Sequence, residues 1–187
     1  MIAQKPLIVE AFESLISLPE NDGRKLELIN GEIVEEMPNP LHGLITMLLG
    51  AIFVNYFRDH PIGWVLAEVR IKFPDESLND LIPDVVVILA ETRNILADDL
   101  TKPFPFVPDL VIEIQSPGQS EVFMTEKADL YLQYGARLSI IVYPLEQKIE
   151  VRRPNGVARF FDGNSGDLSD LLPGLSFPVS RIFPKVE

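Results

Sequence analysis

Two apolar runs in the middle of the chain dominate the pattern of hydrophobic and polar positions. They cover residues 83–89 and 110–115, and both are rich in Val, Ile and Leu. Continuous apolar runs of this length are typical of strands that are buried on both faces of a sheet. Each run carries one carboxylate, Asp84 in the first and Glu113 in the second. Because burying an unpaired carboxylate costs free energy, the two indicate a shared partner, and a divalent cation is the simplest candidate.

Helical spacing of apolar positions predicts three helices, over residues 6–18, 40–58 and 121–134. We expect the second of these to be the central, buried helix. Between the first two helices, residues 25–37 contain Asn30-Gly31, the dipeptide favoured by type I′ turns. This segment therefore predicts a β-hairpin with one face in solvent.

The second buried strand leads through the helix over residues 121–134 to another apolar run, residues 137–143. A strand, a helix and a strand in this order predict a parallel pair with a right-handed crossover. Residues 91–108 are polar and proline-rich, and we interpret them as an excursion flanking a cleft. Further strand signals cover residues 63–73, 146–152 and 157–162, and an apolar tail laid across the domain covers residues 168–183. The pattern predicts an α/β fold with α+β character, in which an N-terminal helix and hairpin precede a central mixed β-sheet flanked by helices.

Length and composition indicate one globular domain over residues 1–187. The chain is 47% hydrophobic and has no cysteine, so disulfides and thiolate metal sites are excluded. Residues 38–57 form the longest stretch without Asp, Glu, Lys or Arg, but polar residues such as Asn55 interrupt it. We therefore expect no membrane span, and because the N-terminus has no signal-peptide pattern we expect a cytoplasmic protein.

The net charge of −12 opposes a simple nucleic-acid-binding function. Phosphate contacts dominate DNA affinity, so DNA-binding proteins usually carry a basic surface. A metal-dependent nuclease can be acidic overall where its basic residues are concentrated at the cleft and cations offset its carboxylates.

The motifs resemble those of one nuclease family. Pro83-Asp84 followed by Glu113-Ile114-Gln115 resembles the PD-(D/E)XK signature of restriction-endonuclease-like nucleases. The chain resembles the Uma-two type of restriction endonuclease more closely, and the matching pieces occur in the expected order. They are residues 26–32, His42, Pro83-Asp84, residues 108–117, Lys127 with Tyr131, and residues 172–175.

The resemblance implies a metal-dependent hydrolase. Asp84 and Glu113, with a backbone carbonyl near Ile114, would hold Mg²⁺ or Mn²⁺ through oxygen. Gln115 stands where the superfamily has a lysine, and strand alternation places it on the same side as Glu113. Gln115 would position the attacking water. The resemblance offers Lys127, fourteen residues after Glu113, as the replacement cation. The alternative for Lys127 is a lysine whose ammonium extends to solvent.

Two further residues are second-rank candidates for the site. Glu27 matches the family's Glu-Leu-Ile-x-Gly pattern and is either an additional acid at the metal or a solvent-facing strand residue. His42, in the first turn of a predicted helix, is either a capping or surface histidine or a group that contacts metal-bound water or phosphate.

The resemblance implies a Mg²⁺-dependent endodeoxyribonuclease that hydrolyses DNA phosphodiester bonds and acts as a homodimer. The alternative is a catalytically weak or inactive domain that serves as a binding or assembly module. The replacement of lysine by Gln115 and the net charge of −12 both favour that alternative. A small-molecule hydrolase is disfavoured because no nucleophile, phosphate-binding Gly loop or zinc-ligand spacing is present.

Overall fold

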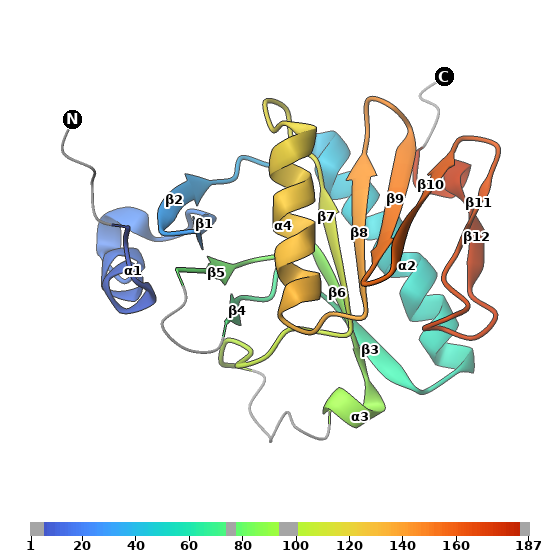
Figure 1. Ribbon diagram of the computed structural model, residues 1–187, viewed down its shortest axis with the longest axis horizontal. Coiled ribbons are helices and arrows are strands. Elements are labelled where there is room, and N and C mark those ends of the chain that lie inside the picture. The colour runs from blue at the N-terminus through green and yellow to red at the C-terminus, as the bar shows by residue number, and fades with distance from the viewer. Residues whose placement is uncertain (1–5, 74–77, 94–100, 184–187) are drawn as a thin grey trace.

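The computed structural model describes residues 6–73, 78–93 and 101–183. A six-stranded sheet lies at its centre (Figure 1). In spatial order its strands are β10 (Gly156–Phe161), β9 (Lys148–Arg153), β8 (Leu138–Tyr143), β7 (Leu110–Ile114), β6 (Val85–Leu89) and β3 (Gly63–Ala67). Only the β7–β8 pair is parallel within this sheet, and the other neighbours are antiparallel. The prediction of a mixed sheet with a parallel crossover is therefore confirmed.

Two helices cover opposite faces of this sheet (Figure 1). Helix α2 (Pro40–Asp59) packs on the face that carries Leu110 and Ile112. Helix α4 (Glu121–Gln133) packs on the face that carries Val111, the residue between them. Because side chains alternate along a strand, Glu113 lies on the same face as Val111, under α4. As expected, the Ser120 side chain caps α4 by accepting a hydrogen bond from the Phe123 amide.

The N-terminal helix and hairpin form as predicted. Helix α1 (Val9–Ile16) precedes a hairpin of β1 (Leu26–Ile29) and β2 (Glu32–Glu35). Both faces of β1 are buried, however, so the expected solvent face is found on β2 only. Asn30 and Gly31 have φ angles of 51° and 82°, as a type I′ turn requires. The hairpin belongs to a second sheet, β2-β1-β5-β4, which also contains β5 (Asp80–Leu81) and β4 (Ile71–Lys72).

The prediction of one strand over residues 63–73 is wrong. Strand β3 ends at Ala67, and the chain then crosses to the second sheet as β4. Glu68 makes the change of direction with a φ angle of 51°, and its amide donates to the Asp84 carbonyl. Alternation of apolar residues continued across this corner, so the pattern alone gave no sign of it.

The excursion predicted over residues 91–108 returns to the core. It begins with α3 (Ala90–Arg93), and its residues 94–100 lie outside the described part. Phe104 and Val107 are buried, and Phe104 forms a bridge with Ile71. The C-terminal part of this segment therefore contributes buried side chains to the core between the two sheets.

The C-terminal tail is laid across the α2 side of the core, as predicted. It contains β12 (Ser176–Pro178), which pairs with β11 (Ser165–Asp167) just before the tail, and the short 3₁₀ helix η2 (Val179–Arg181). A second short 3₁₀ helix, η1 (Pro19–Asn21), follows α1. Leu172 and Phe177 are buried in the same cluster as the inner face of α2.

Helix α2 is buried on one side only, which corrects the expectation of a buried helix. Its inner side carries His42, Ile45, Leu49, Phe53, Tyr56 and Phe57. Its outer side is also apolar, since Leu44, Met47 and Val54 are 43%, 72% and 56% exposed. Among the described helices, α2 alone has the length and mean hydropathy of a membrane span, but its packed inner side is that of a core helix.

Candidate functional site

The register of β6 and β7 brings the two strand carboxylates together. Val85 pairs with Ile112, so the next position places Asp84 opposite Glu113 on the α4 side. Asp84 Oδ2 accepts a hydrogen bond of 2.8 Å from the Ile114 amide, which fixes the carboxylate at the end of the strand. Both side chains are 1% exposed.

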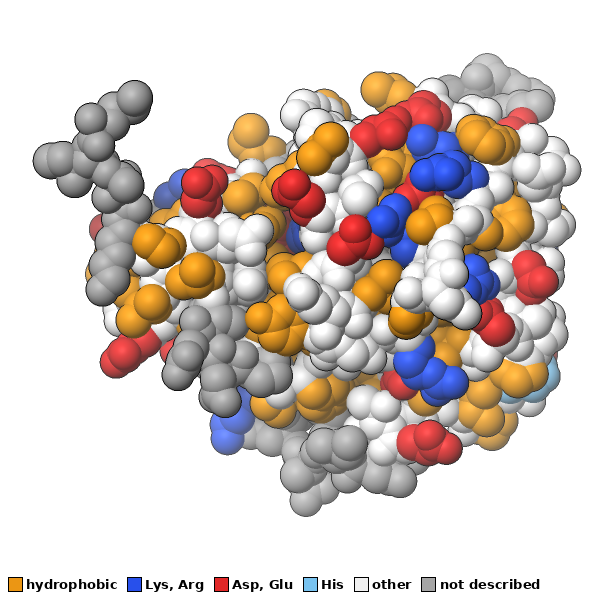
Figure 2. All heavy atoms as spheres, in the orientation of Figure 1, with side chains coloured by type: hydrophobic (Ala, Val, Ile, Leu, Met, Phe, Trp, Pro, Cys, Tyr) orange, Lys and Arg blue, Asp and Glu red, His pale blue; other side chains and the backbone are white. Residues whose placement is uncertain are grey.

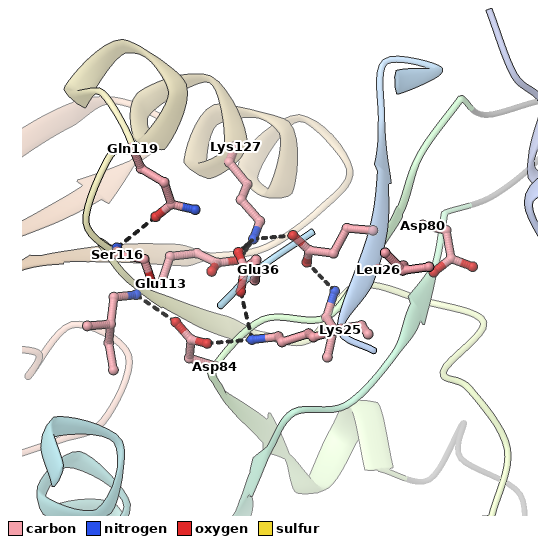
Figure 3. Close-up of polar contacts among 12 residues, drawn as sticks. Lys25, Leu26, Glu36, Asp80, Asp84, Glu113, Ser116, Gln119 and Lys127 are labelled. Carbon is pink, nitrogen blue, oxygen red and sulfur yellow. Dashed lines mark hydrogen bonds and ion pairs between the residues drawn. The ribbon is translucent and has the colours of Figure 1, made fainter. Parts of the chain in front are cut away.

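Lys127 reaches the same place from the overlying helix α4. Its ammonium lies 2.8 Å from Glu27 Oε2, 2.9 Å from Glu36 Oε1 and 3.1 Å from Glu113 Oε1 (Figure 3). The residue is 1% exposed, so the alternative of an ammonium extending to solvent is excluded. Its position beside Glu113 agrees with the predicted convergence, while its catalytic role stays a prediction.

A second lysine, Lys25, completes the arrangement. Its ammonium lies 2.8 Å from Asp84 Oδ1 and 2.8 Å from Glu36 Oε2 (Figure 3). Glu36 therefore bridges the two lysines. We call Lys25, Glu27, Glu36, Asp84, Glu113 and Lys127 the acid–lysine cluster.

Hydrogen bonds from outside the cluster hold its two deepest carboxylates. The Ile82 amide donates to Glu27 Oε1 at 2.6 Å, and the Tyr131 hydroxyl donates to Glu113 Oε1 at 2.6 Å. Glu27 is 0% exposed, so the alternative of a solvent-facing strand residue is wrong. On the opposite side of β1, Leu26 and Leu28 are buried against Phe12 of α1, so both faces of this strand are covered and only β2 is largely exposed.

The cluster contains more negative charge than positive charge. Four carboxylates share two ammonium groups, so full ionisation would leave two uncompensated negative charges. Burial raises the pKa of Glu27 to about 7, although the charge of Lys127 opposes the shift. Burial also raises the pKa of Glu113 well above its usual range, again against the charge of Lys127. The cluster therefore retains protons near neutrality.

The other two carboxylates stay ionised. Burial would raise the pKa of Asp84, but the hydrogen bond with His42 and the charge of Lys25 outweigh it and lower that pKa to about 2. Burial opposes ionisation of Glu36 as well, yet the two lysines hold the pKa of Glu36 below its usual range. The pKa of Lys127 is raised because the surrounding carboxylates outweigh its burial. The two carboxylates that stay ionised, Asp84 and Glu36, therefore both contact Lys25, and Asp84 also contacts His42.

His42 connects the cluster to a pocket at the start of α2. Its Nε2 lies 3.1 Å from Asp84 Oδ2, and it is 5% exposed, so it is not a surface histidine. The pocket has a volume of about 160 Å³. It is lined by Asn39, Leu41, His42, residues 115–119, Pro144 and Leu145. The pocket therefore has a lining residue, His42, in direct contact with Asp84.

Gln115 lies in this pocket and not in the cluster. Strand β7 ends at Ile114, and the Gln115 Nε2 donates to the Gln119 carbonyl at 2.9 Å, within the turn before α4. Its backbone amide still donates to the Val142 carbonyl of β8, so the strand ladder reaches this residue. The role of Gln115 in positioning the attacking water stays a prediction.

Comparison with known proteins identifies the family. The model of the Uma2 family, described as "Putative restriction endonuclease", matches residues 9–180. The chain belongs to the Uma2 family. A crystal structure of a "putative nuclease" from Anabaena variabilis has the same fold, with a TM-score of 0.79 and 23% identity over 95% of this chain and 98% of that one. Among curated proteins, no similar sequence was found.

Three residues at the centre of this Uma2 site escaped assignment from the sequence. Lys25 and Glu36 lie opposite each other at the open end of the hairpin, where the Glu36 amide donates to the Lys25 carbonyl. Tyr131 was noted beside Lys127 in the family motif but given no role. The sequence did contain a relevant signal. A two-residue turn at Asn30-Gly31 fixes the pairing of the two strands, and this pairing places Lys25, Glu27 and Glu36 on one face of the hairpin.

The donor set fits a hard divalent cation. Mg²⁺ is usually held by one or two carboxylates together with water and substrate phosphate, and Asp84 and Glu113 are adjacent oxygen donors. The surplus of two negative charges equals the charge of such an ion. Within the described residues, no group of three or more acidic, histidine or cysteine side chains is arranged around one ion position. A cation in this Uma2 site would therefore rely on two carboxylates, with the Ile114 carbonyl as the predicted third ligand.

Proposed function

We propose that the chain is a divalent-cation-dependent endonuclease that hydrolyses DNA phosphodiester bonds at the acid–lysine cluster. The observation that carries the proposal is the charge imbalance of the buried cluster, four carboxylates against two ammonium groups. Membership of the Uma2 family supports the same reaction class. Mg²⁺ or Mn²⁺, held by Asp84 and Glu113, would supply a Lewis acid and lower the pKa of a bound water.

Each protein group has a task that follows from its contacts. The Ile114 amide and His42 fix Asp84 in its ionised form, ready to bind a cation. Tyr131 and Lys127 orient Glu113 from the α4 side. Because Lys127 is buried and permanently charged, it also stabilises negative charge that develops nearby on a phosphate.

Access to the cluster is through the pocket beside His42. The carboxylates of the cluster are at most 8% exposed, so a DNA phosphate cannot contact Asp84 in this conformation. Lys25 contacts Asp84 from the less buried side, with 11% of its side chain exposed. We therefore expect Lys25 to exchange its carboxylate partner for the incoming phosphate when DNA binds.

Cation-dependent stability and nicking of supercoiled plasmid together test this function. The melting temperature of the wild type should rise with Mg²⁺ or Mn²⁺ relative to EDTA, by the equivalent of about 2.7 kcal/mol at a hundredfold excess over the dissociation constant. Glu113→Gln keeps the size of the side chain and removes one charge. It should lose most of this stabilisation and the nicking activity together.

The matched control is Glu126→Gln, at an exposed position of the same helix that carries Lys127. This variant should keep the wild-type response to cations and the wild-type nicking rate. A wild type that neither gains stability from cations nor nicks DNA would contradict the proposal.

A specific observation also favours the second candidate, an inactive binding or assembly module. Every carboxylate of the cluster already has a lysine, tyrosine or amide partner, as a purely structural network would require. On the face shown in Figure 2, acidic and basic side chains are interspersed over α4, β9 and β10, and this face has no broad basic patch. Arg152 and Arg153 of β9 are paired with Asp129 and Asp170. An inert wild type in the cation test would establish this candidate.

A further inference from the structure

The outer face of helix α2 is apolar and uncharged although it is exposed to solvent in the monomer. From Pro40 to Phe57 the helix contains no charged residue, although one whole side faces away from the core. Met47 is 72% exposed and Val54 is 56% exposed. A surface helix normally carries polar residues there, so this face has the composition of a buried one.

Two glycines on the same face give the second, independent observation. Gly43 and Gly50 lie inside the helix, where glycine is less stable than alanine. A Cβ atom at either position would meet no atom within 4 Å, so packing inside the monomer requires neither glycine. Close approach of another backbone is a physical reason for glycine at such a site.

The large and small residues alternate along one line. Gly43, Met47, Gly50 and Val54 follow one another at spacings of four, three and four residues, the repeat of a helix–helix seam. If a second copy of α2 runs antiparallel about a twofold axis between positions 48 and 49, Met47 faces Gly50 of the other copy. Gly43 then faces Val54 of the other copy. Each large side chain meets a glycine, so the seam is complementary to itself, as a twofold interface must be.

We propose that α2 is the homodimer interface of this protein, formed by antiparallel packing of the seam Gly43–Met47–Gly50–Val54 against its own copy. The expectation of a homodimer rested on family resemblance and named no surface. This inference does not depend on nuclease activity.

The outer face of α2 is too small for a stable dimer interface by itself, so the surfaces on either side of the helix must also be buried. Twenty residues of helix are about 30 Å long and about 10–12 Å wide, a strip well below the ~800 Å² per partner of a standard interface. A groove of about 380 Å³ runs beside the C-terminal half of α2, lined by Leu48, Ala51, Leu175 and Phe177 among others. Antiparallel packing brings the N-terminal half of the other copy, with its exposed Leu41 and Leu44, alongside this groove. Because the dimer is twofold symmetric, Leu41 and Leu44 of each copy lie beside the groove of the other copy.

Electrostatics favour the same orientation. No charge is buried in the seam, and antiparallel helices place each positive N-terminal end beside the negative C-terminal end of the other copy. A parallel pair would set Met47 against Met47 and align the two helix dipoles in the same direction.

Sedimentation and light scattering across a wide concentration range provide the first test. The wild type should form a species of twice the 21.0 kDa monomer mass. Met47→Lys and Gly50→Leu should each raise the dimer dissociation constant by about tenfold or more, as expected for substitutions at the centre of an interface. A Cβ at position 50 meets no atom within 4 Å, and leucine is a better helix former than glycine. The Gly50→Leu monomer should therefore melt no lower than the wild-type monomer. The control Val122→Lys changes a similarly exposed apolar residue on α4 and should leave the dissociation constant unchanged.

Cross-linking tests the orientation, since the natural chain has no cysteine. Proteins carrying Gly43→Cys and Val54→Cys should form disulfide-linked dimers when mixed. Neither should do so alone, because like positions lie eleven residues, about 16 Å, apart along the antiparallel pair. Disulfides in each protein alone would overturn the antiparallel arrangement. A wild type that stays monomeric at every concentration would overturn the proposed interface. The same conclusion would hold if the monomer bound phosphatidylglycerol vesicles through α2.

Discussion

Lys127 is the counterion that three buried carboxylates share. Its ammonium lies within 3.1 Å of oxygens from Glu27, Glu36 and Glu113, and all four side chains are nearly inaccessible to solvent. A buried ion network of this kind gains stability mainly because every member is paired. Loss of the lysine would leave several carboxylates without their principal partner.

Lys127→Met therefore tests the lysine with little change in volume. We expect a loss of about 3–5 kcal/mol in unfolding free energy at pH 8, the usual result of breaking a buried pair. The loss should be smaller at pH 5, since the carboxylates can then take up protons. Urea unfolding at the two pH values gives the measurement. Arg24→Met breaks an exposed pair with Glu35 and should change the unfolding free energy far less at either pH, because surface pairs contribute little. Equal effects of the two substitutions would contradict the network.

The raised pKa of Glu27 predicts how stability depends on pH. An acid whose folded-state pKa lies above its unfolded value binds more protons when folded, so its contribution is present at low pH and is lost as pH rises. For Glu27 the window extends from about 4.5, its ordinary value, to about 7. Within that window each pH unit should cost about 1.4 kcal/mol for one proton.

The measurement is urea unfolding of the wild type and Glu27→Gln between pH 5 and pH 8. The variant should show a shallower decline with pH, because its amide does not titrate. Glu32→Gln, on the exposed strand of the same hairpin, should decline like the wild type. Parallel curves for Glu27→Gln and the wild type would mean that Glu27 is ionised throughout this range.

At the scale of elements, the N-terminal hairpin delivers half of the acid–lysine cluster. Glu27 comes from β1, and Lys25 and Glu36 flank the two strands at the open end of the hairpin, while the rest come from the large sheet and α4. Arg70 anchors the hairpin by pairing with Asp80 and donating to the Leu26 carbonyl at 3.2 Å. The position of the hairpin therefore decides whether the cluster can form.

Gly31 offers a way to disturb the hairpin without touching the cluster. A Cβ at this position would lie 2.5 Å from the Pro6 Cβ, and its φ angle of 82° already disfavours other residues. Gly31→Ala should lower the unfolding free energy by more than the roughly 1–2 kcal/mol expected of the φ angle alone. Gly23→Ala is the matched control, since Gly23 has a φ angle of 75° and open space around it. Thermal melts that show equal losses would mean that the contact with Pro6 relaxes.

The sequence predicted most of the regular elements and part of the site. Asp84 and Glu113 were recoverable because each interrupts an apolar strand, and Lys127 because helical spacing places it on the sheet side of α4. The corner at Glu68 was not recoverable, since a single residue with positive φ leaves the alternation intact. Lys25 and Glu36 were missed because a hairpin pattern shows which residues share a face but not which face meets the core. The contact of the Gln115 side chain with the Gln119 carbonyl was not recoverable, since it depends on the turn that follows β7.

At the scale of the whole molecule, the net charge of −12 sets a self-repulsion that the local ion pairs do not remove. Many of the described basic residues are paired locally, including Arg24, Arg152 and Arg153. Exposed acidic groups therefore repel one another over distances comparable to the Debye length, about 10 Å at 0.1 M salt.

Added monovalent salt should accordingly raise the melting temperature of the wild type. The reason is screening of the repulsion among surface carboxylates, which is strongest in the folded state. A series of KCl concentrations in EDTA gives the measurement and also serves as the ionic-strength reference for the Mg²⁺ experiment. A melting temperature that falls as KCl is added would mean that the exposed ion pairs stabilise the fold more than the net charge destabilises it.

The contact between Glu27 and Lys127 joins residues that are 100 positions apart. During synthesis at about 5–20 residues per second, the hairpin would wait about 5–20 s for its lysine. An isolated two-stranded hairpin is only marginally stable in water, so it has no lasting structure until the sheet and α4 have followed. A nascent chain therefore carries no assembled cluster, and the site comes into being only when most of the protein has left the ribosome.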